Sequence, residues 1–144
     1  MYSGVTILLA EDNPGDVFLV RRALEKHGMV KVQLVVVEDG QAALRYIEGV
    51  DADGSMSAPD LALLDLNLPR ATGSRILTKI RQSQRCSGIP IIIVTSSDSP
   101  LDRDSAAELG ATGYFQKPGD LAGFMQLGRV VRDALAGPVP SCVA

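Results

Sequence analysis

The stretch LALLDLNLP, residues 61–69, decides the fold of this chain. Its first four residues are apolar, and they lead directly into Asp65, with Asn67 and Pro69 close behind. A short apolar run that is bounded by a polar residue and a proline is typical of a strand buried on both faces of a parallel sheet. Asp65 would then lie at the carboxyl end of that strand, where open parallel sheets collect their ligands.

Three other strand-like runs also end in polar side chains. VTILLA (5–10) is followed by Glu11 and Asp12, IIIV (91–94) by Thr95, and GYFQ (113–116) by Lys117. Because the carboxyl ends of parallel strands meet at one edge of a sheet, we expect one site built from acids, a hydroxyl and an amine.

Helical patterns separate these strands, and a further apolar run at residues 32–37 provides a fifth strand. Asn13, Asp39 and Asp120 stand where they can cap the first, second and last helices. Residues 51–59 form the longest polar loop, and the fourth helix is expected to run from Ser99-Pro100 to Leu109-Gly110. The alternation predicts an α/β fold with a five-stranded parallel doubly wound sheet and five helices. The last helix is expected to carry one apolar stripe, formed by Leu121, Phe124, Met125, Val131 and Leu135.

Composition limits the class of protein. The chain has 144 residues, is 46% hydrophobic and carries a net charge of −3, which fits one domain with a real core and argues against a dominant nucleic-acid role. Cys86 and Cys142 are far apart and in no metal-binding spacing, so we expect two reduced thiols. No signal peptide and no membrane-length apolar stretch is visible in the sequence, so a cytoplasmic protein is expected.

The three carboxylates of Glu11, Asp12 and Asp65 would repel one another at close range and therefore need a cation. All-oxygen ligands favour Mg²⁺, and a backbone carbonyl near Asn67 could join the carboxylates. Lys117 adds a compact positive charge suited to a phosphoryl oxygen. These are the parts that phosphoryl transfer requires, and an aspartate can serve as the nucleophile.

The whole arrangement resembles the receiver domain of two-component response regulators. An acidic pair after the first strand, Asp-x-Asn-x-Pro after the third, Thr after the fourth and Lys-Pro after the fifth occur in that family's order. The resemblance covers residues 5 to about 136, which leaves 137–144 as a tail of a single receiver domain with no output domain.

The resemblance implies a role for each site residue. Asp65 would be the phospho-acceptor, and Thr95 and Lys117 would bind the phosphoryl group. Asp12 would ligate Mg²⁺ directly, and Glu11 would act through water. Tyr114 stands where receivers carry an aromatic switch that is coupled to the threonine. The Lys117-Pro118 peptide bond would be cis.

Finer features resemble the stand-alone regulators that are paired with phytochrome-type histidine kinases: the EDNPGD stretch (11–16), the long loop before the third strand and the lack of an output domain. This implies a sensor histidine kinase as partner, with no nucleic acid and no membrane. Because such a regulator has no attached effector, we also expect a homodimer through the face formed by the fourth helix, the fifth strand and the last helix, whose apolar stripe continues into the tail residues Val139, Val143 and Ala144. The alternative is that the sheet uses the whole stripe and the tail is disordered.

Simpler roles compete for individual residues. Asp39 is interpreted as a helix cap alone, and His27 as a cap in the last turn of the first helix rather than a phosphohistidine. Tyr114 by itself could be core packing instead of a switch.

Two other functions are weighed against the switch. A phosphatase of the haloacid dehalogenase type also uses Asp, Thr, Lys and Mg²⁺. Those enzymes, however, carry an Asp-x-Asp motif at the nucleophile, whereas this chain has Asn67 in place of the second Asp. Their metal-binding acids also come later in the chain. A constitutive interaction module would not need the full set of acids, threonine and lysine. The sequence therefore favours a phosphorylation switch that is not an enzyme beyond catalysing its own aspartyl phosphorylation and dephosphorylation.

Overall fold

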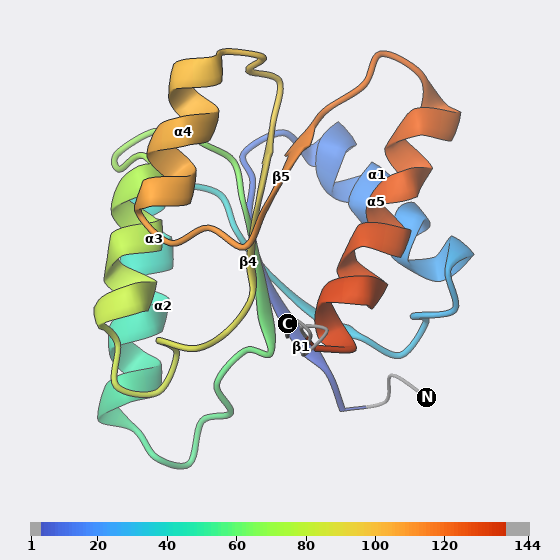
Figure 1. Cartoon of the computed structure of the whole chain (residues 1–144). Helices are drawn as coiled ribbons and strands as arrows, with labels where there is room; N and C mark the ends of the chain where they lie inside the picture. The colour runs from blue at the N-terminus through green and yellow to red at the C-terminus, as the bar shows by residue number, and fades with distance from the viewer. Residues whose placement is uncertain (1–3, 138–144) are drawn as a thin grey trace, which may run out of the picture.

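Five parallel strands form one sheet in the computed structural model, which describes residues 4–137 (Figure 1). The strand order is β2-β1-β3-β4-β5. The strands are β1 (Thr6–Ala10), β2 (Gln33–Val37), β3 (Leu61–Leu64), β4 (Ile91–Thr95) and β5 (Gly113–Gln116). The central strands β1, β3 and β4 are buried along their whole length, which explains their continuous apolar sequences.

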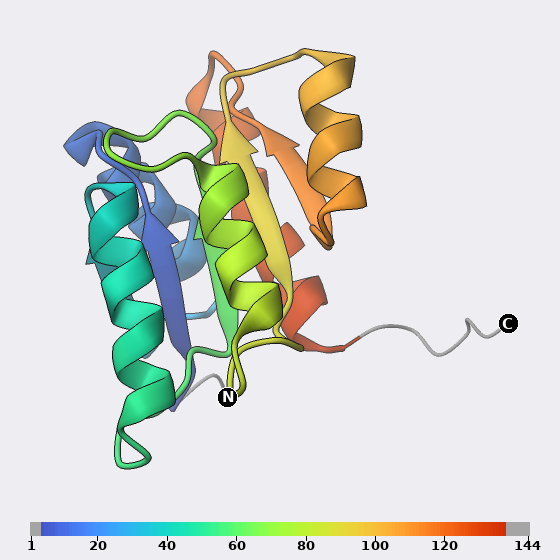
Figure 2. The same ribbon diagram turned by 90° about the vertical axis from the view of Figure 1, so that its left-hand side faces the viewer.

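The helices cover both faces of this sheet, as Figures 1 and 2 show from two sides. They are α1 (Pro14–Lys26), α2 (Gly40–Ala52), α3 (Gly73–Gln82), α4 (Pro100–Glu108) and α5 (Leu121–Leu135). The first and last helices pack together on one face, and the other three lie on the opposite face. The predicted doubly wound fold is thus confirmed.

Alternation along each strand supplies two separate cores. Leu8 and Leu64 point into the core that includes Ile47 and Ile76 of α2 and α3. Their neighbours in sequence, such as Leu9 and Leu63, point into the core beneath α1 and α5. The carboxyl edge of the sheet, by contrast, carries the polar residues.

Capping side chains fix where the helices begin. Asn13 Oδ1 accepts a 2.8 Å hydrogen bond from the Gly15 amide, and Asp39 Oδ1 accepts one of 2.8 Å from Ala42. Asp120 caps α5 by accepting from Gly123 at 3.2 Å. All three predicted caps are therefore confirmed, and they bring three helix N-termini to the edge that carries the acids.

His27 is the residue at which α1 ends. Its backbone amide donates to the Leu24 carbonyl at 3.2 Å, whereas its ring Nε2 is buried with no hydrogen-bond partner among the described residues. The helix end is therefore closed by the backbone of His27 rather than by its ring Nε2.

Several predicted boundaries are corrected. β1 and β2 each begin one residue later than expected, and β4 extends to include Thr95. The second helix continues through Ala52, so the polar loop begins after it. The last turn of this helix is stabilised by tertiary contacts that a local sequence pattern does not predict. Asp51 accepts a 2.7 Å hydrogen bond from Ser83 Oγ, and the Arg85 guanidinium donates to the Val50 carbonyl at 2.6 Å.

Two further expectations were wrong. No peptide bond is cis within residues 4–137, so the Lys117-Pro118 bond is trans. Leu121 does not share the buried stripe of α5, because its side chain is 62% exposed at the first position of the helix, whereas Phe124, Met125 and Val131 are buried. The predicted tail contacts of Val139, Val143 and Ala144 lie outside the described residues.

No helix within the described part of the chain is both long enough and apolar enough to cross a membrane.

Candidate functional site

The adjacent strands β1 and β3 bring three acidic side chains together. Ala10 pairs with Leu64 in the sheet, so the residues that follow each strand lie side by side, and the Asp65 amide donates to the Ala10 carbonyl at 3.1 Å. One carboxylate oxygen from each of Glu11, Asp12 and Asp65 lies within 4.8 Å of the others. The predicted acidic cluster is therefore formed, with Glu11 and Asp65 buried and Asp12 exposed.

Lys117 lies at the centre of this cluster although β5 is two strands away from β3. Its Nζ is 2.8 Å from Glu11 Oε1 and 2.9 Å from Asp65 Oδ2. Its backbone amide donates to the Thr95 carbonyl at 2.8 Å, which continues the β4–β5 pairing to the site. The strand pairing thus carries the lysine to the edge, and its length lets the ammonium reach across β4.

Asp16 is a fourth acid in the site that the sequence did not assign to it. Its Oδ2 is 2.7 Å from Lys117 Nζ. Asp16 lies in the first turn of α1, where its charge also interacts favourably with the helix N-terminus. The available signal was the third acid in EDNPGD, four positions after Asp12.

These contacts use all three N–H donors of the Lys117 ammonium. Burial of the ammonium lowers the pKa of Lys117, but the hydrogen bonds to Asp16, Glu11 and Asp65 outweigh that effect and raise the pKa above its ordinary value. Burial also raises the pKa of Glu11, against the opposing effect of the hydrogen bond from Lys117. Lys117 is therefore a fixed positive charge at any physiological pH.

The donor set fits a hard divalent cation. Within residues 4–137, Lys117 is the only cation paired with the acids of the cluster, so one positive charge faces four carboxylates. Carboxylate oxygens are the ligands that Mg²⁺ prefers. The predicted ligand Asn67 is exposed in the β3–α3 loop, where its backbone N–H donates to Asp65 Oδ1 at 3.1 Å and orients that carboxylate.

Thr95 and Tyr114 lie on one side of the cluster. Thr95 is fully buried at the end of β4, and its Oγ1 accepts a 3.4 Å bond from the Ser97 amide. The Tyr114 hydroxyl reaches the same loop, and the Arg103 guanidinium lies 4.5 Å from the centre of its ring. The structure therefore connects the end of β4, the first turn of α4 and β5.

The loop after Asp65 depends on a glycine that sequence reasoning overlooked. A Cβ atom on Gly73 would collide with the Asp65 carbonyl oxygen, and the Gly73 amide donates to the Leu66 carbonyl at 3.2 Å. Gly73 thus allows α3 to begin directly against the backbone of the acidic site. Thr72, the N-cap that precedes it, was the local signal.

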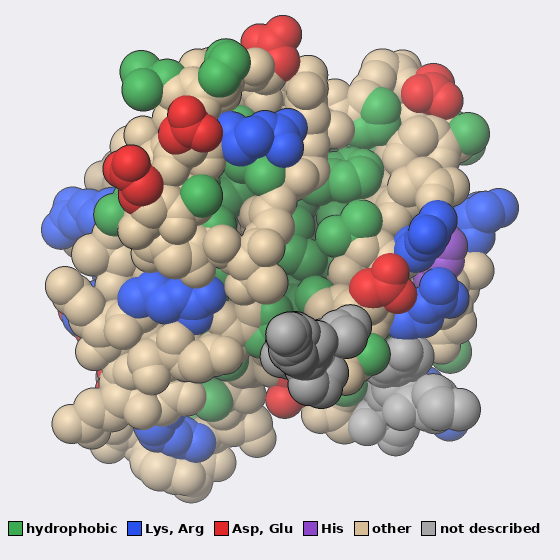
Figure 3. All heavy atoms as spheres, viewed as in Figure 1, with side chains coloured by type: hydrophobic (Ala, Val, Ile, Leu, Met, Phe, Trp, Pro, Cys, Tyr) green, Lys and Arg blue, Asp and Glu red, His purple; other side chains and the backbone are tan. Residues whose placement is uncertain are grey.

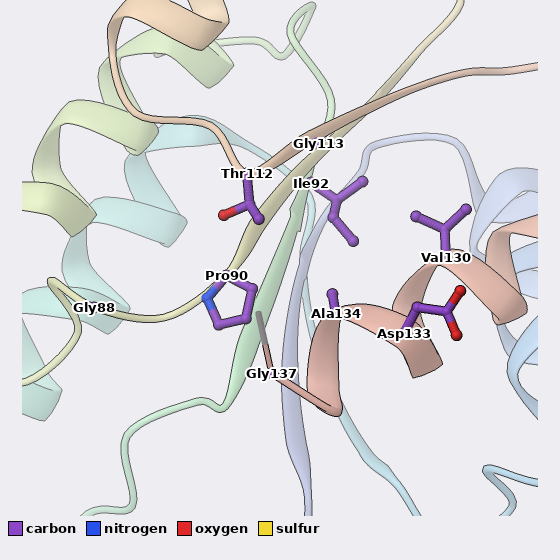
Figure 4. Close-up of a pocket in the computed structure, with 9 residues that line it drawn as sticks. All are labelled: Gly88, Pro90, Ile92, Thr112, Gly113, Val130, Asp133, Ala134 and Gly137. Carbon is purple, nitrogen blue, oxygen red and sulfur yellow. The ribbon is translucent and has the colours of Figure 1, made fainter. Parts of the chain in front are cut away.

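A separate pocket of about 440 Å³ lies at the opposite edge of the sheet, near the start of β4 and β5 and the end of α5 (Figure 4). Its lining residues are Gly88, Pro90, Ile92, Thr112, Gly113, Val130, Asp133, Ala134 and Gly137. Hydrophobic side chains are also visible in the hollow between α4 and α5 in Figure 3. None of the residues that line this pocket belongs to the acidic cluster.

Comparison with known sequences agrees with this geometry. The model of the response regulator receiver domain matches residues 7–127. The chain is 37% identical over 112 residues to the probable methanogenesis regulatory protein FilR2 of Methanothrix harundinacea, covering 78% of this chain and 71% of that protein. It is 33% identical over 115 residues to response regulator Rcp1 of Synechocystis, covering 80% and 78%.

Solved structures of response regulators and receiver domains have the same fold as this chain. The phosphorylated cyanobacterial phytochrome response regulator RcpA superposes with a TM-score of 0.81 at 29% identity, covering 92% of this chain and 94% of RcpA. The Mn²⁺-bound form of Rcp1 gives 0.78 at 29% identity, covering 90% and 92%. The receiver domain of sensor kinase PA1611 of Pseudomonas aeruginosa, with magnesium in its active-site cleft, gives 0.74 at 27%, covering 94% and 100%. With its fold, its acidic edge and its central lysine, this chain belongs to the response regulator receiver domain family.

Proposed function

We propose that Asp65 is the phospho-acceptor of a signalling switch. The observation that carries this proposal is the 2.9 Å contact between Asp65 Oδ2 and the Lys117 ammonium, within a cluster of acids suited to a divalent cation. One Asp65 oxygen would attack the phosphorus of a phosphohistidine, forming a P–O bond as the P–N bond breaks. The resulting acyl phosphate would place new negative charge beside Lys117 and Thr95, which would bind the phosphoryl oxygens.

Glu11, Asp12, Asp65 and Asn67 would hold Mg²⁺, with Glu11 acting through water. The bound ion would offset the charge of the acids and of the incoming phosphoryl group. Support comes from the all-oxygen donor set and from the Mn²⁺ and magnesium found in the related receivers.

Thr95 and Tyr114 would transmit the signal. A shift of the Thr95 hydroxyl toward the phosphoryl group would release the Ser97 amide, and Tyr114 is bonded to that same residue. The first turn of α4 would then respond to the state of Asp65, which is how a buried reaction can alter a surface.

The partner would be a sensor histidine kinase, and the similarity to Rcp1 and RcpA favours one of the phytochrome type. The chain would act as a cytoplasmic receiver, without enzymatic activity toward other substrates. A homodimer through α5 and the neighbouring α4–β5 surface stays part of the proposal. The exposed Leu101 and Leu109 could contribute to it, since most of the α5 stripe is used by the protein's own core. Sedimentation with and without beryllofluoride tests the dimer.

Incubation with acetyl phosphate and Mg²⁺, followed by mass spectrometry, tests the central claim. The wild type should gain one phosphoryl group on Asp65, and Asp65→Asn should gain none. Continuous hydrolysis of the donor would favour a phosphatase instead, and no reaction at all would favour a constitutive interaction module. A label on Ser96, Ser97 or His27 would overturn the mechanism.

A further inference from the structure

Asp16 differs from the other partners of Lys117 in one respect. Glu11 and Asp65 belong to the set of carboxylates that could hold a metal ion, whereas Asp16 does not. Asp16 nevertheless makes the shortest of the three contacts, at 2.7 Å compared with 2.8 Å and 2.9 Å. The ammonium thus has one partner of its own outside the metal-binding group.

This partner matters because Lys117 and a metal ion need the same oxygens. If Glu11 and Asp65 alone neutralised the ammonium, a cation entering the cluster would have to weaken both bonds of a buried charge. A third carboxylate keeps Lys117 compensated while the other two turn to the metal. It also adds negative charge beside the cluster, which attracts a divalent cation.

The same carboxylate has the opposite effect on a phosphoryl group. A phosphoryl group on Asp65 would carry negative charge toward Lys117, and Asp16 both repels that charge and competes for the ammonium. The side chain of Asp16 is 22% exposed, whereas that of Glu11 is 3% exposed. Asp16 is therefore the partner that water can solvate most readily when the ammonium leaves it.

We infer that Asp16 is a positioning residue that keeps Lys117 compensated when a metal ion takes the oxygens of Glu11 and Asp65, and that releases Lys117 when Asp65 is phosphorylated. The inference rests on the proposed function. The contact also joins the first turn of α1 to the loop between β5 and α5, so its release would loosen a link between those two elements.

The test compares the wild type with Asp16→Asn and Asp16→Ala in two titrations. The first measures Mg²⁺ binding by calorimetry, and the second measures beryllofluoride binding at saturating Mg²⁺. Asp16→Asn should weaken Mg²⁺ binding about three- to tenfold and strengthen beryllofluoride binding by a similar factor. Asp16→Ala should show the same two signs, because both variants remove the charge.

Glu38→Gln is the matched control. Glu38 is exposed and lines the same surface pocket as Glu11 and Asp12, but it forms no ion pair within the described residues. Its replacement should change either affinity less than about twofold, since its charge is not directed at Lys117.

The two opposite signs distinguish this role from a structural one, because a damaged site would bind both ligands less well. Loss of both affinities in the Asp16 variants, or no change in either, would overturn the inference while leaving Asp65 as the phospho-acceptor. If the wild type itself failed to bind beryllofluoride, the proposed function would fail, and this inference with it.

Discussion

The hydroxyl of Tyr114 donates a 3.1 Å hydrogen bond to the backbone carbonyl of Ser97. This bond joins an edge strand to the loop that follows β4, and the loop is held further by the 2.6 Å bond from Ser97 Oγ to Asp102 in the first turn of α4. The Tyr114 side chain is thus held by two contacts: its hydroxyl bonds to Ser97, and the guanidinium of Arg103 lies over the face of its ring.

Tyr114→Phe should lower the free energy of unfolding by about 1 kcal/mol, because a partly buried carbonyl loses its donor. Urea denaturation measures the change. Tyr46→Phe is the control, since the Tyr46 hydroxyl has no hydrogen bond within residues 4–137, and it should be nearly neutral. An equal loss in both variants would show that the bond to Ser97 contributes nothing.

Lys117→Met should make the protein depend on Mg²⁺ for stability. Without the ammonium, the carboxylates of Glu11, Asp16 and Asp65 repel one another with no compensating charge. A bound divalent cation would then reduce that repulsion and stabilise the folded state. Thermal melts should show a lower Tm than wild type in EDTA and a larger rise with millimolar Mg²⁺. A variant that melts like wild type in EDTA would contradict the electrostatic role of the lysine.

Gly128→Ala should destabilise the protein by about 2 kcal/mol or more, because a Cβ there would collide with the Ala23 carbonyl oxygen of α1. Gly49→Ala, also within a helix, meets only the Met56 sulfur at 3.9 Å and should be neutral or stabilising by up to about 1 kcal/mol. Chemical denaturation of the two variants measures the change in the free energy of unfolding, and their difference tests whether α1 and α5 are in close contact at Gly128. Similar effects of the two changes would refute the close packing.

Arg81→Met should cost about 2–3 kcal/mol, since its guanidinium donates to the carbonyls of Ser87, Ile89 and Gly110 and so joins the loops before β4 and β5. Lys79→Met, two positions earlier in the same helix, removes only an exposed ion pair with Glu48 and should cost less than about 0.5 kcal/mol. Comparable losses would mean that the three carbonyls find other donors.

Cys86 should resist alkylation while the protein is folded. Burial raises the pKa of its thiol, so the native state keeps the proton at pH values where an unfolded chain begins to lose it. In a Cys142→Ser background, iodoacetamide at pH 8 should react only after denaturation. The raised pKa also predicts that the free energy of unfolding declines as the pH rises above the ordinary pKa of a thiol. Rapid labelling of the native protein would contradict both expectations.

Sequence patterns were sufficient where each residue's position follows from its own strand. Glu11, Asp65, Thr95 and Lys117 all follow apolar runs, and the pleated parallel sheet brings those ends to one edge whatever the loops do. The caps Asn13, Asp39 and Asp120 were equally local, because a cap bonds only to amides two or three positions away.

The remaining features depend on partners that are distant in sequence. The role of Asp16 is defined by a lysine 101 positions later, and the last turn of α2 depends on groups more than 30 positions away. Leu121 fits the helical repeat but lies at the first position of α5, where the side chain is largely open to solvent. Periodicity identifies a helix face, but it does not show how far the opposing surface extends.

The 106 positions between Glu11 and Lys117 also bear on how the protein is made. Translation delivers β1 and its acids first, and Lys117 leaves the ribosome only after all five strands have been synthesised. A nascent chain therefore carries Glu11, Asp16 and Asp65 before it carries Lys117, the cation that contacts all three in the folded protein. If Lys117 binds the phosphoryl group as proposed, a nascent chain acquires that function only after β5 has been synthesised and has docked on β4.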